Sequence, residues 1–137
     1  GEGYRLTAGL MCFPSSWMIT QKLGRTLPSI HGPVPEFAGV SSIVERMLGA
    51  IRVEQPLMRA NFLLYADPNL HQPRREGENK PLPANDPRYI RVERQTFRRL
   101  PNTLAVVFAI HTSIVSTDRL SKEEVNILRQ VKPEFGL

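Results

Sequence analysis

The sequence predicts an α+β domain in which an antiparallel sheet carries helices on one side. Three observations favour this class. Two strand-like segments are joined by Pro101-Asn102, and apolar residues recur at helical spacing over residues 36–52. A capping box at Ser121 begins another helix, which is expected to end near Pro133. A chain of 137 residues has the size of one domain with its own core. We therefore expect residues 1–137 to form a single unit.

The first third of the chain alternates short elements with stiff connections. Alternating and aromatic residues predict a strand over residues 4–13, and Ser15 or Ser16 is expected to cap a short helix over residues 17–23. Prolines and a glycine within residues 27–35 predict a shaped loop without a regular helix. The amphipathic helix that follows should cover one face of the sheet.

The remaining strands lie in the second half. Residues 57–66 predict a strand, and the proline-rich segment 67–88 predicts a long surface loop. Residues 89–100 and 103–115 then predict an antiparallel hairpin. Because its second strand is almost entirely apolar, we expect that strand to be central. The sheet is expected to have about four strands.

The first strand of this hairpin is unusually polar. Side chains alternate between the faces of a strand, which places Arg91, Glu93, Gln95, Phe97 and Arg99 on one face and Val92, Arg94, Thr96, Arg98 and Leu100 on the other. Burying such groups is costly unless partners compensate, so a polar or anionic partner is expected. Arg59, Arg94 and Arg98 could clamp carboxylates bidentately, or form ion pairs with Glu93 or Glu54.

Composition narrows the classes of partner. The net charge of +5 is spread along the chain among acidic residues, which does not favour nucleic acid. The longest apolar run, Leu104 to Ile110, is too short to anchor the chain in a membrane. The single cysteine, Cys12, excludes an intrachain disulfide and suits a reducing compartment. We expect a cytoplasmic or organelle-matrix location.

Common catalytic motifs are absent, and a few residues with chemical potential remain. The sequence has no phosphate-binding glycine loop, Cys-x-x-Cys pair, His-Glu-x-x-His or Gly-x-Ser-x-Gly. His31 lies between prolines, so its imidazole suits an axial metal ligand or an acid/base group, or else a structural hydrogen bond. Cys12 could ligate a soft metal or be a small core residue. His71 is expected to be solvated and His111 half-buried.

Several blocks, in order, carry a resemblance. They are Cys12-Phe13-Pro14-Ser15 with Trp17, Lys22-Leu23-Gly24, Ile30-His31 before Pro33-Val34-Pro35, Arg59-Ala60-Asn61, and Glu93-Arg94-Gln95-Thr96 before Arg99-Leu100-Pro101. Their order and spacing resemble the haem-binding alpha subunit of haem-dependent oxidative N-demethylases, through most of the chain. The resemblance implies a PAS-like fold that holds haem b and its iron.

The resemblance also implies an activity. In that family a methyl group of a small secondary amine leaves as formaldehyde, with O2 and electrons from a reductase partner that carries FMN and an iron–sulfur cluster. The roles that carry over are His31 as axial ligand with Cys12 as a thiolate alternative, Arg59 and Arg94 for the haem propionates, and Glu93 and Gln95 on the catalytic polar side of the pocket. The alternatives are a PAS-type module that binds or senses haem or another small ligand without turnover, and a structural domain whose arginines form only internal ion pairs.

The sequence departs from the family pattern in three ways. Family members carry further sequence before the Cys-Phe-Pro-Ser block, which implies that residues 1–137 are the C-terminal portion of the family domain. Phe62 replaces the usual tryptophan after Arg-x-Asn, and His111 replaces an arginine near the end of the last apolar strand. These departures bear on substrate choice and haem retention.

Overall fold

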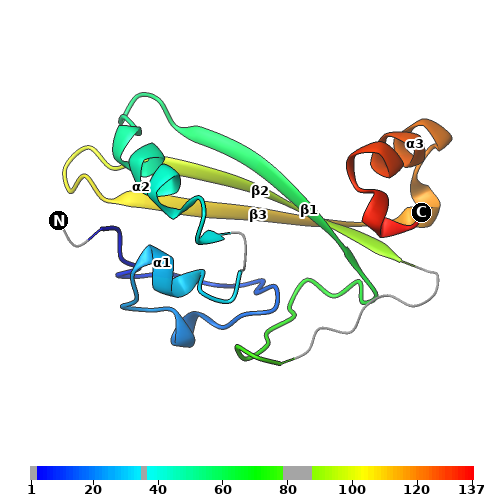
Figure 1. Ribbon diagram of the computed structural model, residues 1–137, viewed down its shortest axis with the longest axis horizontal. Coiled ribbons are helices and arrows are strands. Elements are labelled where there is room, and N and C mark those ends of the chain that lie inside the picture. Colours follow the sequence, from blue (N-terminus) through cyan, green and yellow to red (C-terminus); the bar gives the residue numbers. More distant parts are fainter. Residues whose placement is uncertain (1–2, 35–36, 79–87) are drawn as a thin grey trace.

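The sheet is built from the second half of the chain. The computed structural model describes residues 3–34, 37–78 and 88–137. Its strands are β1 (Leu57–Tyr65), β2 (Tyr89–Arg99) and β3 (Val106–Ser116), which form one three-stranded antiparallel sheet in the order β1-β2-β3 (Figure 1). The predicted α+β class, the strand after residue 56 and the hairpin are confirmed. The PAS-like topology stays a prediction.

The order of the strands corrects one expectation. The apolar strand β3 lies at an edge of the sheet, and the polar strand β2 is central. The prediction was wrong because it took apolar composition alone as the sign of a central strand. On β2, Arg91 and Gln95 are buried with hydrogen-bonding partners, whereas Val107 and Phe108 on β3 are 44% and 47% exposed. Partners for the polar groups decide which strand is buried.

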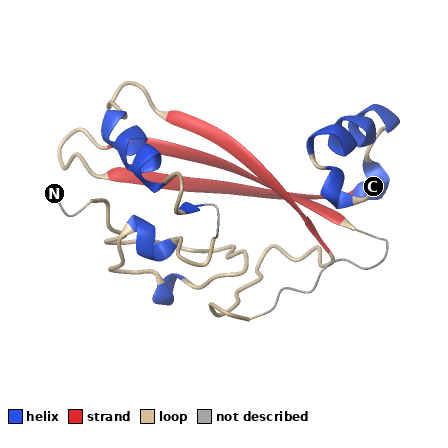
Figure 2. Cartoon of the chain, viewed as in Figure 1, coloured by secondary structure: helices blue, strands red, loops and turns tan. Residues whose placement is uncertain are grey.

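The described helices precede β1 or follow β3 in the chain, and they lie beside the sheet (Figure 2). Helix α2 (Ser41–Ala50) is shorter than the predicted helix over 36–52, whose first residue lies outside the described residues. Helix α1 (Leu27–Ile30) forms where no helix was expected. Pro28 lies in its first turn, where a missing N–H costs nothing, and the Thr26 side chain caps it. The predicted loop after β1 is confirmed as far as residue 78.

The N-terminal predictions were only partly right. Residues 4–13 form no strand; one isolated bridge joins Arg5 and Thr26, because the partner segment turns into α1 directly after it. The predicted helix over 17–23 is reduced to the 3₁₀ turn η1 (Ile19–Gln21). Ser16 has a positive φ of 62°, whereas a residue that caps a helix has an extended backbone, so Ser16 does not cap a helix here.

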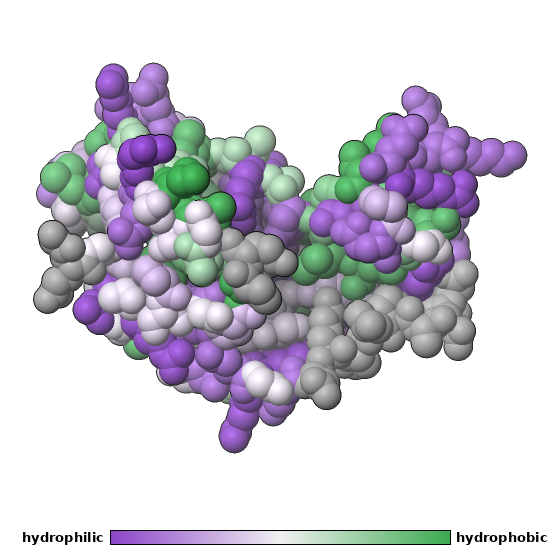
Figure 3. All heavy atoms as spheres, in the orientation of Figure 1, coloured by the Kyte–Doolittle hydropathy of each residue, from purple (hydrophilic) through white to green (hydrophobic). Residues whose placement is uncertain are grey.

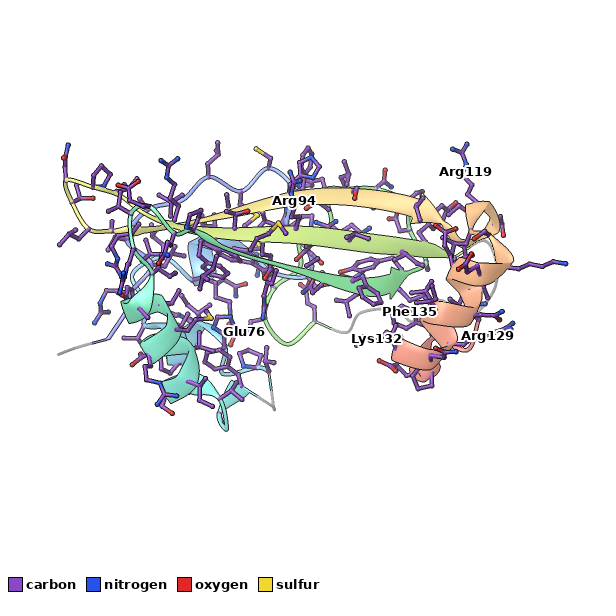
Figure 4. The ribbon with its side chains drawn as sticks, turned by 90° about the horizontal axis from the view of Figure 1, so that it is seen from above. Glu76, Arg94, Arg119, Arg129, Lys132 and Phe135 are labelled. Atoms are coloured by element: carbon purple, nitrogen blue, oxygen red, sulfur yellow. The ribbon has the colours of Figure 1, made fainter. Side chains whose placement is uncertain are left out.

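Helices contact both faces of the sheet, at opposite ends. Arg99 donates to the carbonyls of Leu48 and Ile51 at the end of α2, at 2.7 and 2.6 Å. At the other end, α3 (Lys122–Val131) leads into the 3₁₀ turn η4 (Pro133–Phe135), and the buried Phe135 meets the ring of Phe62 edge-on (Figure 4). Phe62 points away from the face that carries Arg99. The expected one-sided placement therefore holds for α2 and not for the α3 end.

The predicted capping box at the start of α3 is confirmed. The Ser121 hydroxyl accepts from the Glu124 N–H at 3.2 Å, and the Glu124 carboxylate accepts from the Ser121 N–H at 2.8 Å. These hydrogen bonds, led by the one from the Ser121 backbone, lower the pKa of Glu124 below its ordinary 4.5. The folded state then binds protons less readily than the unfolded state, so this stabilisation is present above about pH 4.5 and is lost as pH falls below it.

We expect Ser121→Ala to lower the free energy of unfolding by about 1 kcal/mol, because Ala offers no acceptor to the first turn. Urea unfolding followed by circular dichroism at pH 7 and at pH 4 measures the loss, which should be similar at both pH values because Ala keeps the backbone N–H that binds the Glu124 carboxylate. Ser42→Ala, at an exposed serine within α2, is the control. An equal loss in both variants would contradict the capping role.

Candidate functional site

A row of polar side chains crosses β1 and β2 on one face of the sheet. Arg91 Nε donates to Glu93 Oε1 at 3.1 Å, and Gln95 Nε2 to Glu93 Oε2 at 3.4 Å. Arg59, directly opposite Gln95 in the register, donates from Nε to Gln95 Oε1 at 2.6 Å. The shared face of Arg91, Glu93 and Gln95 is as predicted. We call Arg59, Arg91, Glu93 and Gln95 the polar row.

Arg91 joins this row to two other parts of the chain. Only 1% of the residue is exposed, and its Nη1 and Nη2 each donate over 2.8 Å, to the carbonyls of Leu70 and Phe13. Its guanidinium also lies 5.8 Å from the centre of the Tyr65 ring. Arg91 thereby holds the N-terminal segment and the loop after β1 against the sheet. Sequence analysis found its face but gave it no role, since nothing in the sequence showed which carbonyls it would meet.

The Cys-Phe-Pro-Ser block lies against the loop after β1. Gln72 N donates to the Pro14 carbonyl at 3.0 Å, and Ser16 N to the Gln72 carbonyl at 2.9 Å. The hydroxyls of Ser15 and Tyr65 are hydrogen-bonded to each other. The block therefore forms part of the layer over the polar row rather than a strand of the sheet.

Cys12 in this block and His71 in the loop beside it are both accessible. Cys12 is exposed, so the alternative of a small core residue was wrong. His71 is exposed as predicted, and its Nδ1 lies 3.0 Å from the Cys12 carbonyl. Sequence analysis missed this contact because the two residues are far apart in the chain.

His31 has a fixed ring orientation. Its Nδ1 lies 3.0 Å from the Leu27 carbonyl, one turn back in α1, and its ring stacks on Phe37 with centroids 4.1 Å apart. A carbonyl can only accept, so Nδ1 carries the hydrogen and Nε2 carries the lone pair. No described residue bonds Nε2. The structural hydrogen bond is therefore present at Nδ1, and it leaves Nε2 available for the ligand role that stays a prediction.

A buried lysine supports the end of α1. Lys22 is 5% exposed and its Nζ donates over 2.9 Å to both the Ile30 carbonyl and the Glu76 carboxylate. The hydrogen bond from Lys22 is the main cause that lowers the pKa of Glu76, whose position is labelled in Figure 4. The Lys-Leu-Gly block thereby fixes the backbone next to His31.

Arg94 is not part of this arrangement. It faces Ala60 and His111 across the sheet, on the face opposite Arg59, and it is exposed (Figure 4). The sheet itself separates the two arginines that were expected to act together. His111, on the same open face, is exposed rather than half-buried.

Residues 1–134 match the family described as haem-dependent oxidative N-demethylase, alpha subunit-like. The chain belongs to this family. The description makes the family haem-dependent oxidoreductases, and an alpha-subunit-like member implies an enzyme of more than one subunit. Within the described ranges, no helix is long and apolar enough to cross a membrane.

The residues of this family member fit a haem in part. No three or more His, Cys, Asp or Glu side chains of the described residues gather as a metal site, but haem iron needs only one axial imidazole from the protein. His31 supplies a lone pair at Nε2 with the other nitrogen fixed by a carbonyl, the usual arrangement of a ligating histidine. Arg59 is exposed and only its Nε has a described partner, so its terminal nitrogens can meet a carboxylate.

Proposed function

We propose that this chain is the haem-binding subunit of an oxidase that removes a methyl group from a small secondary amine. The balanced reaction converts R–NH–CH3, O2, two electrons and two protons into R–NH2, formaldehyde and water. The electrons come from a separate reductase subunit with FMN and an iron–sulfur cluster. When bound, haem b supplies the redox chemistry with O2.

The observation that carries the proposal is the state of His31 within a haem-dependent family. Its Nδ1–H is held by the Leu27 carbonyl and its ring by Phe37, so Nε2 is pre-oriented as an axial ligand. Lys22 donates to the Ile30 carbonyl at the end of α1 and so holds the backbone next to His31. Cys12, exposed on its segment, is the alternative ligand as a thiolate.

The polar row supports the remaining roles. Arg59, with its free terminal nitrogens, is proposed to bind a haem propionate. Arg94 lies on the other face of the sheet, so we do not propose that it binds a propionate of the same haem. The row thus offers one arginine rather than two to the cofactor.

Glu93 and Gln95 are proposed to handle the amine. The Glu93 side chain is only 15% exposed and is paired with Arg91, which makes it an acceptor for an N–H of the substrate. Gln95 is buried and bonded on both sides, to Arg59 and to Glu93, so it fixes the position of the carboxylate. The pair would orient the amine and take up a proton at Glu93 Oε2.

The test is formaldehyde release by the native protein, reconstituted with haemin and supplied with reductant, O2 and a small secondary amine with a ¹³C-labelled methyl group. We expect labelled formaldehyde that depends on the reductant. Glu93→Gln should lower its rate by about 100-fold, within the range for loss of a proton-transfer group. Arg94→Gln, exposed on the same strand, is the control and should change the rate little.

Other results would identify other functions. Stoichiometric haem without any formaldehyde would replace the enzyme by a haem-binding or sensing module. Absence of haem after reconstitution would leave a structural domain.

A further inference from the structure

The outer edge of β3 carries a continuous set of backbone groups that have no partner among the described residues. Leu100 N donates to the Ala105 carbonyl and Thr117 N to the Arg88 carbonyl, each at 2.9 Å, at the two ends of the β2–β3 ladder. Hydrogen-bonded pairs recur at every second residue of an antiparallel ladder. The odd-numbered residues of β3 therefore bond β2. The even-numbered residues direct N–H and C=O away from it: Val106, Phe108, Ile110, Thr112, Ile114 and Ser116.

No strand in the described part of the chain pairs with this edge. No backbone or side-chain hydrogen bond reaches these outward groups from residues 3–34, 37–78 or 88–137. In Figure 1, β3 has β2 on one side only. A row of this kind is a template for another strand.

The sequence of β3 lacks the features that keep an edge strand solitary. Its eleven residues include no proline and no Lys, Arg, Asp or Glu. The other edge strand, β1, is protected: Pro56 directly precedes it and Arg59 lies within it. Proteins usually place charges or proline on exposed edges to prevent pairing. The unprotected edge strand is the longer one, and it carries no charged side chain.

The exposed area of the chain agrees with a missing contact. Its accessible surface is 9670 Å², whereas a monomer of 15.5 kDa is expected to expose about 7,200 Å². A stable interface buries roughly 800 Å² per partner. Hydrophobic surface is visible at both the α2 and the α3 ends (Figure 3), and Phe108 and Val115 on β3 are 47% and 38% exposed.

We propose that β3 pairs antiparallel with β3 of a second copy of this chain, which makes one continuous sheet across a two-fold axis at His111. This register uses every residue of the strand. Phe108 then lies opposite Ile114 of the second copy, and Val107 opposite Val115, so apolar side chains meet on both faces. A strand without charges meets no like charge when it pairs with itself. The proposal is independent of haem and of the amine oxidation.

Two engineered cysteines test the register, in a Cys12→Ser background that removes the native thiol. At the axis, the two copies of position 111 form a non-hydrogen-bonded pair with Cα atoms about 4.5 Å apart, within the range of a disulfide. His111→Cys should therefore give a disulfide-linked dimer on mild oxidation. Ser113→Cys is the matched control, exposed on the same strand and face, because its two copies lie roughly 13 Å apart.

A second pair of variants tests the hydrogen bonds. Thr112→Pro removes one outward N–H and leaves the bonds to β2 intact, as an edge strand permits. It should raise the dissociation constant of the dimer, measured by analytical ultracentrifugation of the native protein, by about thirtyfold, since symmetry removes two bonds. Thr112→Val keeps the N–H and should remain dimeric.

A monomeric native protein would overturn the proposal, as would equal disulfide yields from positions 111 and 113. Slow hydrogen exchange at the even-numbered β3 amides in a monomer would assign the edge to a different polypeptide segment and would also overturn it. Formaldehyde release and haem binding do not enter these tests.

Discussion

Replacing Arg91 with methionine is expected to lower the free energy of unfolding by about 3–5 kcal/mol. The side chain is 1% exposed, pairs with Glu93 and donates to the carbonyls of Leu70 and Phe13. Methionine fills a similar volume but donates nothing, so a nearly buried carboxylate and two carbonyls lose their partner at once. Urea unfolding at pH 7, followed by intrinsic fluorescence and circular dichroism, measures the loss.

The matched control lies three residues along the same strand. Arg94→Met changes an exposed arginine on the opposite face and should alter stability by less than about 0.5 kcal/mol. Arg91→Lys keeps the charge but loses the planar guanidinium that reaches two carbonyls. Its loss of unfolding free energy should lie between the losses of the two methionine variants. Similar losses for Arg91→Met and Arg94→Met would show that the interior contacts of Arg91 contribute little.

The contrast between these arginines shows how far the sequence determines this fold. Alternation along a strand placed Arg91 and Arg94 on opposite faces, and the structure agrees. The same alternation could not say which face would be covered, because the carbonyls that bind Arg91 belong to Phe13 and Leu70, in segments without regular structure. Local signals therefore gave the class and most elements, and long-range partners decided the rest.

Strand order failed for the same reason. Apolar composition favoured β3 as the central strand, whereas the structure places the polar strand β2 there. In the structure, Gln95 and Arg91 are buried because Arg59, Glu93 and the covering layer satisfy them. The apolar β3 remains at the edge, which is consistent with a further strand beside it. The apolar composition of a strand indicates that it packs against other residues, but it does not show whether those residues belong to the same chain.

The candidate site divides along similar lines. His31 was singled out by its flanking prolines, and the structure shows a ring with one nitrogen bound to Leu27 and the other available. The support from Lys22 and the contact between His71 and Cys12 depend on tertiary packing, so no local sequence pattern indicates either of them. The structure places Arg59 and Arg94 on opposite faces, because Arg59 lies opposite Gln95 in the register between β1 and β2, and the sequence alone does not show that register.

The axial-ligand role of His31 predicts the largest functional effect. His31→Ala removes Nε2, so the native protein reconstituted with haemin should lose its stoichiometric Soret band, or show it displaced, and should lose formaldehyde release with it. Imidazole added at millimolar concentration can occupy the vacated space and should restore much of the band. Such rescue distinguishes a lost ligand from a lost fold, and circular dichroism checks the fold directly.

His71→Ala is the control with the most similar chemistry. His71 also has Nδ1 beside a backbone carbonyl, that of Cys12, but its ring is exposed and stacks on no aromatic ring among the described residues, whereas the ring of His31 stacks on Phe37. We expect His71→Ala to retain the Soret band, and Cys12→Ser to retain it as well. A band lost in Cys12→Ser and kept in His31→Ala would transfer the ligand role to the thiolate. A band kept in His31→Ala and lost in His71→Ala would show that the stacked and hydrogen-bonded ring beside α1 is not what selects the ligand.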